Sequence, residues 1–190
     1  MQQVLLAIVE AYVNIIAGQD ENDAPFTIVG LEEKINAEIP FALKGKKQSI
    51  KIFGIVDRID IRNGVTRIVD YKTGKDNLSF KEEMEKVFDT NDKHINKALI
   101  QTMIYADAYE KKSGRQNVQP VLHVVRTMQE KGTFFTAGKK ELKDVFLSEI
   151  KPAFLAGLEK KLAELFDEDI PFKASEVPDN YMYSIYTTLY

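Results

Sequence analysis

The dipeptide Asn63-Gly64 constrains the fold of this chain more than any other feature, because it separates two runs of strand-forming residues, 50–61 and 66–72. Asn-Gly between such runs is the strongest short-range indication of a two-residue hairpin, since both residues tolerate the positive φ of a type I′ turn. The two runs are therefore predicted to pair antiparallel. Cross-strand partners then have residue numbers that add up to 127, as Asn63 and Gly64 do.

This register places two aspartates, Asp57 and Asp70, directly opposite each other, on the face that also holds Ile59 and Ile68. Like charges at opposed positions destabilise an antiparallel pair. Because side chains alternate along a strand, Lys72 shares the face of Asp70. A divalent cation between the carboxylates would turn repulsion into ligation, and the ammonium could hold a phosphate or orient a water beside it. The alternative is a plain salt bridge from Lys72 to the two acids.

The other face of the hairpin carries opposite charges. Asp60 lies across from Arg67, which predicts a cross-strand ion pair rather than a metal ligand. The segment 43–75 has nine Lys or Arg and three Asp, a local charge of +6 on a chain whose formal charge is −3. Such a segment can face a polyanion, although a solvated lysine-rich surface explains the composition as well.

The composition restricts the chemistry further. A chain of 190 residues, 44% apolar and 29% charged, is typical of one globular domain. It has no cysteine, which excludes disulfides, Cys-ligated zinc, an iron–sulfur cluster and a cysteine nucleophile. With only His94 and His123 present, a bound metal is expected to be a hard cation held by carboxylates. No apolar run reaches the ~18 residues of a membrane span, and no basic leader precedes the first apolar stretch. We therefore expect a cytoplasmic protein with no membrane contact.

The remaining pattern predicts an α/β fold, with a central mixed sheet and helices on both faces, as one domain over residues 1–190. The apolar segment 4–17 is predicted to form a helix that ends at Gly18 and is buried on several sides, which suggests a piece of a larger protein. The other predicted elements are strands at 26–31, 35–41 and 118–126, a short strand at Phe134-Phe135, a helix over 98–112 that ends near Gly114, helical structure over 142–166 interrupted at Pro152, and an irregular tail from 171 to 190.

Two motifs around the hairpin resemble the core of the PD-(D/E)XK nuclease superfamily. They are Gly54-Ile-Val-Asp-Arg-Ile-Asp60 and Val69-Asp-Tyr-Lys-Thr-Gly74. More specifically, they are similar to the branch typified by the C-terminal nuclease domains of the RecB and AddB helicase–nucleases, over residues 28–126. The resemblance implies a restriction-endonuclease-like core in which Asp57, Asp70 and Lys72 are catalytic. It also implies that Asp57, Asp70 and the carbonyl of Tyr71 bind Mg²⁺ or Mn²⁺.

A further motif, Gln101-Thr-Met-Ile-Tyr105, matches the family's Q-x-x-x-Y signature. The i,i+4 spacing puts both side chains on one helix face, and the resemblance implies that they line the active site and touch DNA. Taken alone, Tyr105 would be assigned to the core. Arg58 and Lys75 are candidate phosphate contacts, although Arg58 lies on the opposite strand face, where a structural role is the alternative.

The chain departs from this family branch in two respects. Relatives often complete the metal site with an upstream His or Glu, for which the candidates here are Glu32 and Glu33; solvated strand-edge glutamates are the alternative. Many relatives also end with cysteines that bind an iron–sulfur cluster. Here the tail 179–186 has tyrosines instead, so no cluster is expected and aromatic packing is expected to close the domain.

The resemblance implies a metal-dependent DNA exonuclease, the nuclease domain of a helicase–nuclease repair protein whose partners are DNA and helicase domains. Two other hypotheses remain at this point. One is a catalytically inactive nuclease fold that binds DNA or acts as a scaffold. The other is an unrelated α/β domain whose carboxylates form only a salt-bridge cluster.

Overall fold

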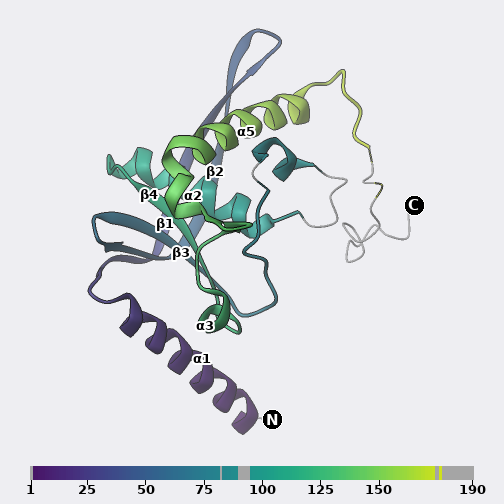
Figure 1. Cartoon of the computed structure of the whole chain (residues 1–190). Helices are drawn as coiled ribbons and strands as arrows, with labels where there is room; N and C mark the ends of the chain where they lie inside the picture. The colour runs from purple at the N-terminus through teal and green to yellow at the C-terminus, as the bar shows by residue number, and fades with distance from the viewer. Residues whose placement is uncertain (1, 82, 90–94, 174–175, 177–190) are drawn as a thin grey trace.

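The structure is a computed structural model that describes residues 2–81, 83–89, 95–173 and 176. Its centre is a four-stranded sheet in the order β1-β2-β3-β4 (Figure 1). The pairs β1–β2 and β2–β3 are antiparallel, whereas β3–β4 is parallel, so the predicted mixed sheet is confirmed. The strands are β1 (Thr27–Leu43), β2 (Lys46–Arg62), β3 (Val65–Lys72) and β4 (Val118–Val124), with a separate pair formed by β5 (Thr136–Ala137) and β6 (Lys140–Glu141).

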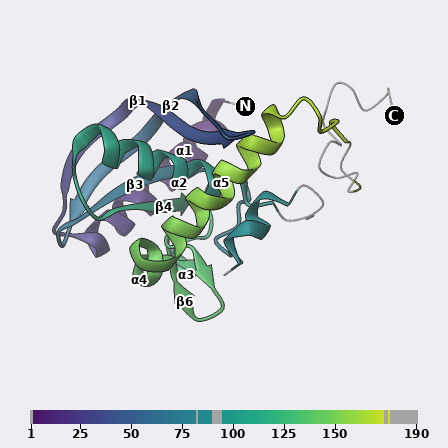
Figure 2. The same cartoon turned by 90° about the horizontal axis from the view of Figure 1, so that it is seen from above.

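Helices lie on both faces of this sheet. The large helices α2 (Lys97–Ser113) and α5 (Lys151–Phe166) cover the same face (Figure 2), and the main apolar core lies beneath them. The opposite face carries α1 (Gln2–Asp23) and α3 (Met128–Lys131). The shorter elements are η1 (Met84–Phe88), α4 (Leu142–Val145) and the π-helical turn η2 (Phe146–Ile150).

The predicted hairpin is confirmed in both turn and register. Asn63 and Gly64 have φ values of 52° and 78°, as a type I′ turn requires. The ladder runs from the pair Arg62–Val65 to the pair Arg58–Val69, and every pair adds up to 127. Asp57 and Asp70 therefore lie immediately beyond the last pair of this ladder.

The strands β1 and β2 extend much further than β3. Their pairing continues to Leu43 and Lys46, so that beyond Arg58 they form a two-stranded ribbon (Figure 1). Two separate strands at 26–31 and 35–41 were expected, and this was wrong, because β1 is continuous. A register shift after Ile28 and a positive φ of 49° at Glu32 change its pleat without ending its pairing.

Helix α2, the first long helix after β3, begins and ends within one residue of the predicted range 98–112. The side chain of Asn96 caps α2 by accepting a hydrogen bond of 2.9 Å from the backbone N–H of Leu99. Gly114 ends the helix in the left-handed conformation, with a φ of 68°. β4 matches the predicted strand 118–126 except for its last two residues.

The prediction for the first helix was wrong in two ways. Gly18 does not end α1, which continues to Asp23, because a glycine inside a helix costs only about 1 kcal/mol. The carboxylate of Asp23 instead receives hydrogen bonds from Arg62 and Arg67. The helix is also not buried on several sides, since the side chains of its first half are exposed, for example Leu5 at 63%.

The C-terminal region is helical, as expected, with Pro152 in the first turn of α5, where its missing N–H leaves no intrahelical bond unmade. No strand forms at Phe134-Phe135; the short strand β5 begins one residue later. Most of the predicted irregular tail, including the expected packing of its tyrosines, lies outside the described residues. Within the described ranges, no helix has the length and apolarity to cross a bilayer.

A buried ionic cluster joins the hairpin to α1. The carboxylate of Asp60 is fully buried and bonds Arg67 through both oxygens, at 2.6 and 3.0 Å. Its second oxygen also lies 2.8 Å from Nε of Arg58. The predicted cross-strand ion pair is confirmed, and Asp60 is occupied by two guanidinium groups.

We predict that Asp60→Asn lowers the free energy of unfolding by about 3–5 kcal/mol, because it leaves two buried arginines short of a counter-charge. Urea denaturation measures this loss. The matched control is Asp169→Asn, which removes an exposed partner of Lys44 and should leave the stability nearly unchanged. Equal effects of the two substitutions would contradict the structural role of Asp60.

We also predict that Gly54→Ala destabilises the contact between β2 and α2. A Cβ at Gly54 would lie 2.5 Å from Cε1 of Tyr105, too close for two non-bonded carbon atoms, so the expected loss is about 1–3 kcal/mol. Gly18→Ala is the control, since its nearest neighbouring atom is 3.9 Å away and a helical alanine is favoured. In a Tyr105→Ala background, Gly54→Ala should cost much less; an unchanged cost would rule out this steric explanation.

Candidate active site

The two predicted acids meet where β3 ends. Oδ2 of Asp57 accepts a hydrogen bond of 2.8 Å from the backbone N–H of Tyr71, the residue next to Asp70. This bond fixes the Asp57 carboxylate against the end of the neighbouring strand. The structure thus brings Asp57 beside Asp70, as the hairpin register predicted.

Lys72 forms an ion pair with one of these two acids. Its Nζ lies 2.8 Å from Oδ2 of Asp70. Burial raises the pKa of the Asp70 carboxyl, and the charges of Asp57 and Asp76 raise it further, while the Lys72 ammonium opposes the rise. Partial burial lowers the pKa of Lys72, but the nearby carboxylates outweigh this effect and the pKa is raised. Lys72 is therefore a cation and a hydrogen-bond donor rather than a base.

Helix α2 supplies the other side of the site. Nζ of Lys72 donates to Oε1 of Gln101 at 3.4 Å, and Nε2 of Gln101 donates to the hydroxyl of Tyr105 at 3.3 Å. The ring of Tyr105 packs against Gly54, where a side chain would leave it no room. The Q-x-x-x-Y residues thus form a hydrogen-bonded chain that ends at the lysine.

The strand β2 changes its alternation near Asp57. Val56 and Ile59 both belong to the main core, although residues three apart in a regular strand point to opposite faces. This irregularity lets Gly54 and Val56 face α2 while Arg58 and Asp60 face α1.

Tyr71 points away from the site, as expected from alternation. Its hydroxyl accepts a hydrogen bond of 3.1 Å from Arg58, and its ring meets His123 edge-on with centroids 5.1 Å apart. Only the main chain of Tyr71 is therefore available to the two acids. Its carbonyl remains a predicted metal ligand.

The side chain of Arg58 is held by α1, which favours the structural role that was the alternative to a DNA contact. This side chain is only 4% exposed and Nη1 lies 2.8 Å from both carboxylate oxygens of Asp20 on α1. A phosphate could reach it only if α1 were displaced. Lys75 is exposed in the loop after β3 and remains a candidate phosphate contact.

The two upstream glutamates lie in different surroundings, and both remain predictions as additional metal-site acids. Glu33 pairs with Lys112 of α2 at 2.7 Å. Glu32 is exposed, and the register places it across from Asp57, between the pairs Leu31–Arg58 and Glu33–Val56. In the part of the chain that the structure describes, no three Asp, Glu, His or Cys side chains are arranged to hold a metal.

The sequence interpretation missed two residues near the site. Asp76 lies in the loop after β3, and its charge raises the pKa of both Asp70 and Lys72. A third acid six residues after Asp70 was the signal that could have identified it. His123 is fully buried behind Tyr71, where burial and two nearby arginines lower its pKa to about 4, so it is neutral. The position of His123 in an apolar strand did not indicate that it would lie near the site.

The oxygen donors fit a magnesium-type ion. Asp57 and Asp70 supply carboxylates, and the main chain of Tyr71 adds a carbonyl next to them. Mg²⁺ is commonly bound by one or two carboxylates, with waters and substrate phosphates filling the other positions. A third protein carboxylate is therefore not required for the residues to fit this ion.

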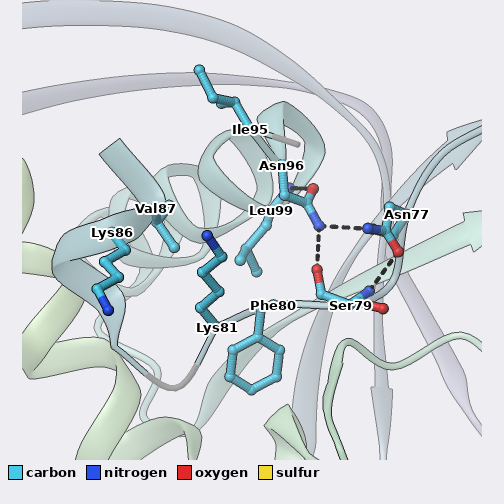
Figure 3. A pocket seen from close by; sticks show the side chains of 9 residues that line it. All are labelled: Asn77, Ser79, Phe80, Lys81, Lys86, Val87, Ile95, Asn96 and Leu99. Carbon is cyan, nitrogen blue, oxygen red and sulfur yellow. Dashed lines mark hydrogen bonds between the residues drawn. The ribbon is translucent and has the colours of Figure 1, made fainter. Parts of the chain in front are cut away.

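A pocket of about 120 Å³ lies between the loop after β3 and the start of α2 (Figure 3). Nδ2 of Asn96 donates to the carbonyls of Asn77 and Ser79, at 2.7 and 2.9 Å. Since Asn96 also caps α2, it joins the loop that leaves Lys72 to the helix that carries Gln101. Local polar contacts thus hold both walls of the site.

The comparisons with known proteins agree with this geometry. The family model for the PD-(D/E)XK nuclease superfamily matches residues 1–177, which is most of the chain. No curated protein matches the sequence. The match extends well beyond the motifs at the site, and the chain belongs to the PD-(D/E)XK nuclease superfamily.

Proposed function

We propose that this chain is a Mg²⁺- or Mn²⁺-dependent deoxyribonuclease that hydrolyses phosphodiester bonds at the site of Asp57, Asp70 and Lys72. The observation that carries the proposal is the contact of Lys72 with Asp70 at 2.8 Å, next to an Asp57 carboxylate fixed by a backbone amide. The same three residue types appear in the family signature, and nuclease chemistry on DNA is what membership implies.

Each side chain has a distinct part in this proposal. Asp57, Asp70 and the carbonyl of Tyr71 would hold the metal ion, which when bound acidifies a water and offsets charge on the scissile phosphate. Lys72 would donate hydrogen bonds to the negative phosphate oxygens as charge builds up on them. Gln101 would keep the ammonium pointed at that position through its bond of 3.4 Å, so it acts as a positioning residue.

The biological setting belongs to the same proposal. The resemblance to the nuclease domains of RecB and AddB supports exonuclease action, in which DNA is digested from its ends. It also supports a role as one domain of a larger, cytoplasmic repair protein that works with helicase domains. Lys75, exposed beside the site, is the candidate contact for the phosphate of a bound strand.

We predict that the chain degrades linear DNA with Mg²⁺ or Mn²⁺ and is inactive in EDTA. Asp70→Asn and Lys72→Ala should each lower the cleavage rate at least a hundredfold, since one loses a ligand and the other the donor that stabilises charge. Lys160→Ala, an exposed substitution on α5, is the matched control. Labelled single-stranded and duplex substrates measure the rates, and thermal unfolding checks that each variant is folded.

Covalently closed circular DNA tests the exonuclease part of the proposal, because it has no ends and should remain intact. Cleavage that persists in EDTA, or that survives Asp70→Asn at the same rate, would exclude this site as the catalyst. Binding of DNA without cleavage under all metal conditions would instead favour an inactive nuclease fold.

A further inference from the structure

We infer that the uncovered side of the β1–β2 ribbon binds an unpaired strand of nucleic acid, with Phe53 stacking on a base between lysines that contact phosphates. We call this side the ribbon face and define it by Lys34, Lys47, Lys51, Phe53 and Ile55. The inference rests on the proposed function, since it names the form of DNA that this nuclease holds, but it concerns residues outside the catalytic set.

Strand alternation determines which side chains make up the ribbon face. Ile35, Ile39 and Ile52 belong to or pack against the core beneath α2 and α5. Residues one position away therefore point to the other side of the ribbon. The register pairs these residues as Lys34 with Ile55, Asn36 with Phe53, Glu38 with Lys51 and Ala42 with Lys47.

Phe53 is unusually exposed for a strand aromatic. Its side chain is 74% exposed, which exceeds the exposure of every other large apolar residue in the described helices and strands. A hollow of about 370 Å³ lies beside it, lined in part by Asn36, Lys51 and Phe53. The ring thus offers a free π-face next to a space that can receive a flat group.

The charges around Phe53 are predominantly positive. Lys34, Lys47 and Lys51 are all exposed. Glu38, which lies across from Lys51 and also lines the hollow, is an acid on this face and accepts a hydrogen bond from the hydroxyl of Ser49. Lysines on either side of an exposed aromatic are the combination that binds single strands, because the lysines follow the backbone while the ring stacks on a base.

This combination favours a single strand over a duplex or a protein. In a duplex the base faces are already stacked on one another, so Phe53 would gain no partner. The centres of protein interfaces are depleted of lysine, whereas here Lys51 lines the hollow beside Phe53. Phe53 also precedes Asp57 by four residues on β2, roughly 13 Å along the strand, and its ring faces the side of the sheet opposite the acids.

The first test uses the absence of tryptophan from the chain. Phe53→Trp places a single tryptophan on the ribbon face, which can be excited selectively over the eight tyrosines. Stacking on a base should quench its fluorescence when a dT15 oligonucleotide is added in EDTA. Leu5→Trp is the control, because Leu5 is 63% exposed and lies on α1, which is not part of the ribbon (Figure 1). Its fluorescence should stay constant.

The second test measures affinity by anisotropy of labelled dT15, again in EDTA. Phe53→Ala should weaken binding on the order of tenfold, while Phe53→Tyr should retain it, because both rings stack. Lys51→Gln should reduce the salt dependence of binding by about one phosphate contact. Lys160→Gln on α5 should change neither quantity.

These outcomes separate the inference from the proposed function. In a chain that carries both Phe53→Trp and Asp70→Asn, dT15 should still quench the tryptophan fluorescence, because the ribbon face does not include the acids. Cleavage by the wild-type chain, together with no effect of Phe53→Ala on dT15 binding, would overturn the inference alone. Tighter binding of a duplex than of dT15 would overturn the inference as well. So would a change in the fluorescence of Phe53→Trp when the protein concentration is raised without DNA. Quenching without cleavage would instead defeat the proposed function.

Discussion

The ion pair between Asp60 and Arg67 holds the register on which the site depends. A slip of one residue in an antiparallel pair turns every side chain of one strand to the other face. Asp70 would then point toward α1 and away from Asp57. A slip would also separate Asp60 from Arg67 in a place where neither is exposed to water, which is strongly unfavourable. The turn at Asn63-Gly64 and this pair therefore specify the same alignment independently.

The sheet assigns different chemistry to its two faces. On the α1 face, Arg58 and Arg67 form ion pairs with Asp20, Asp23 and Asp60, so these charges have partners within the protein. On the α2 face, Asp57, Asp70 and Lys72 form a smaller group in which Asp70 is buried while Asp57 and Lys72 are half-buried. Acids that look alike in the sequence thus have different roles, because Asp60 has two guanidinium partners and Asp57 has a backbone amide.

Local chemistry explains what the sequence predicted well. The turn at Asn63-Gly64, the left-handed Gly114 and the Asp60–Arg67 pair each depend on residues that are close in the chain or directly across a hairpin. What the sequence did not predict depends on distant contacts. The structural role of Arg58 could not be assigned without knowing that Asp20 comes from α1, and the contacts of Asp23 with Arg62 and Arg67 were hidden for the same reason. For the same reason, the sequence predicted only that Gln101 and Tyr105 share a helix face. The hydrogen bonds that link Lys72, Gln101 and Tyr105 depend on the packing of α2 against β2.

The central claim is that one divalent ion sits between Asp57 and Asp70. Crystals grown with Mn²⁺ test it most directly, because anomalous scattering locates the ion independently of the protein atoms. The account predicts one strong peak bound by a carboxylate oxygen of each aspartate, with the carbonyl of Tyr71 as a third protein ligand, and its loss in Asp70→Asn. No peak at saturating Mn²⁺, or a peak that contacts neither aspartate, would contradict it.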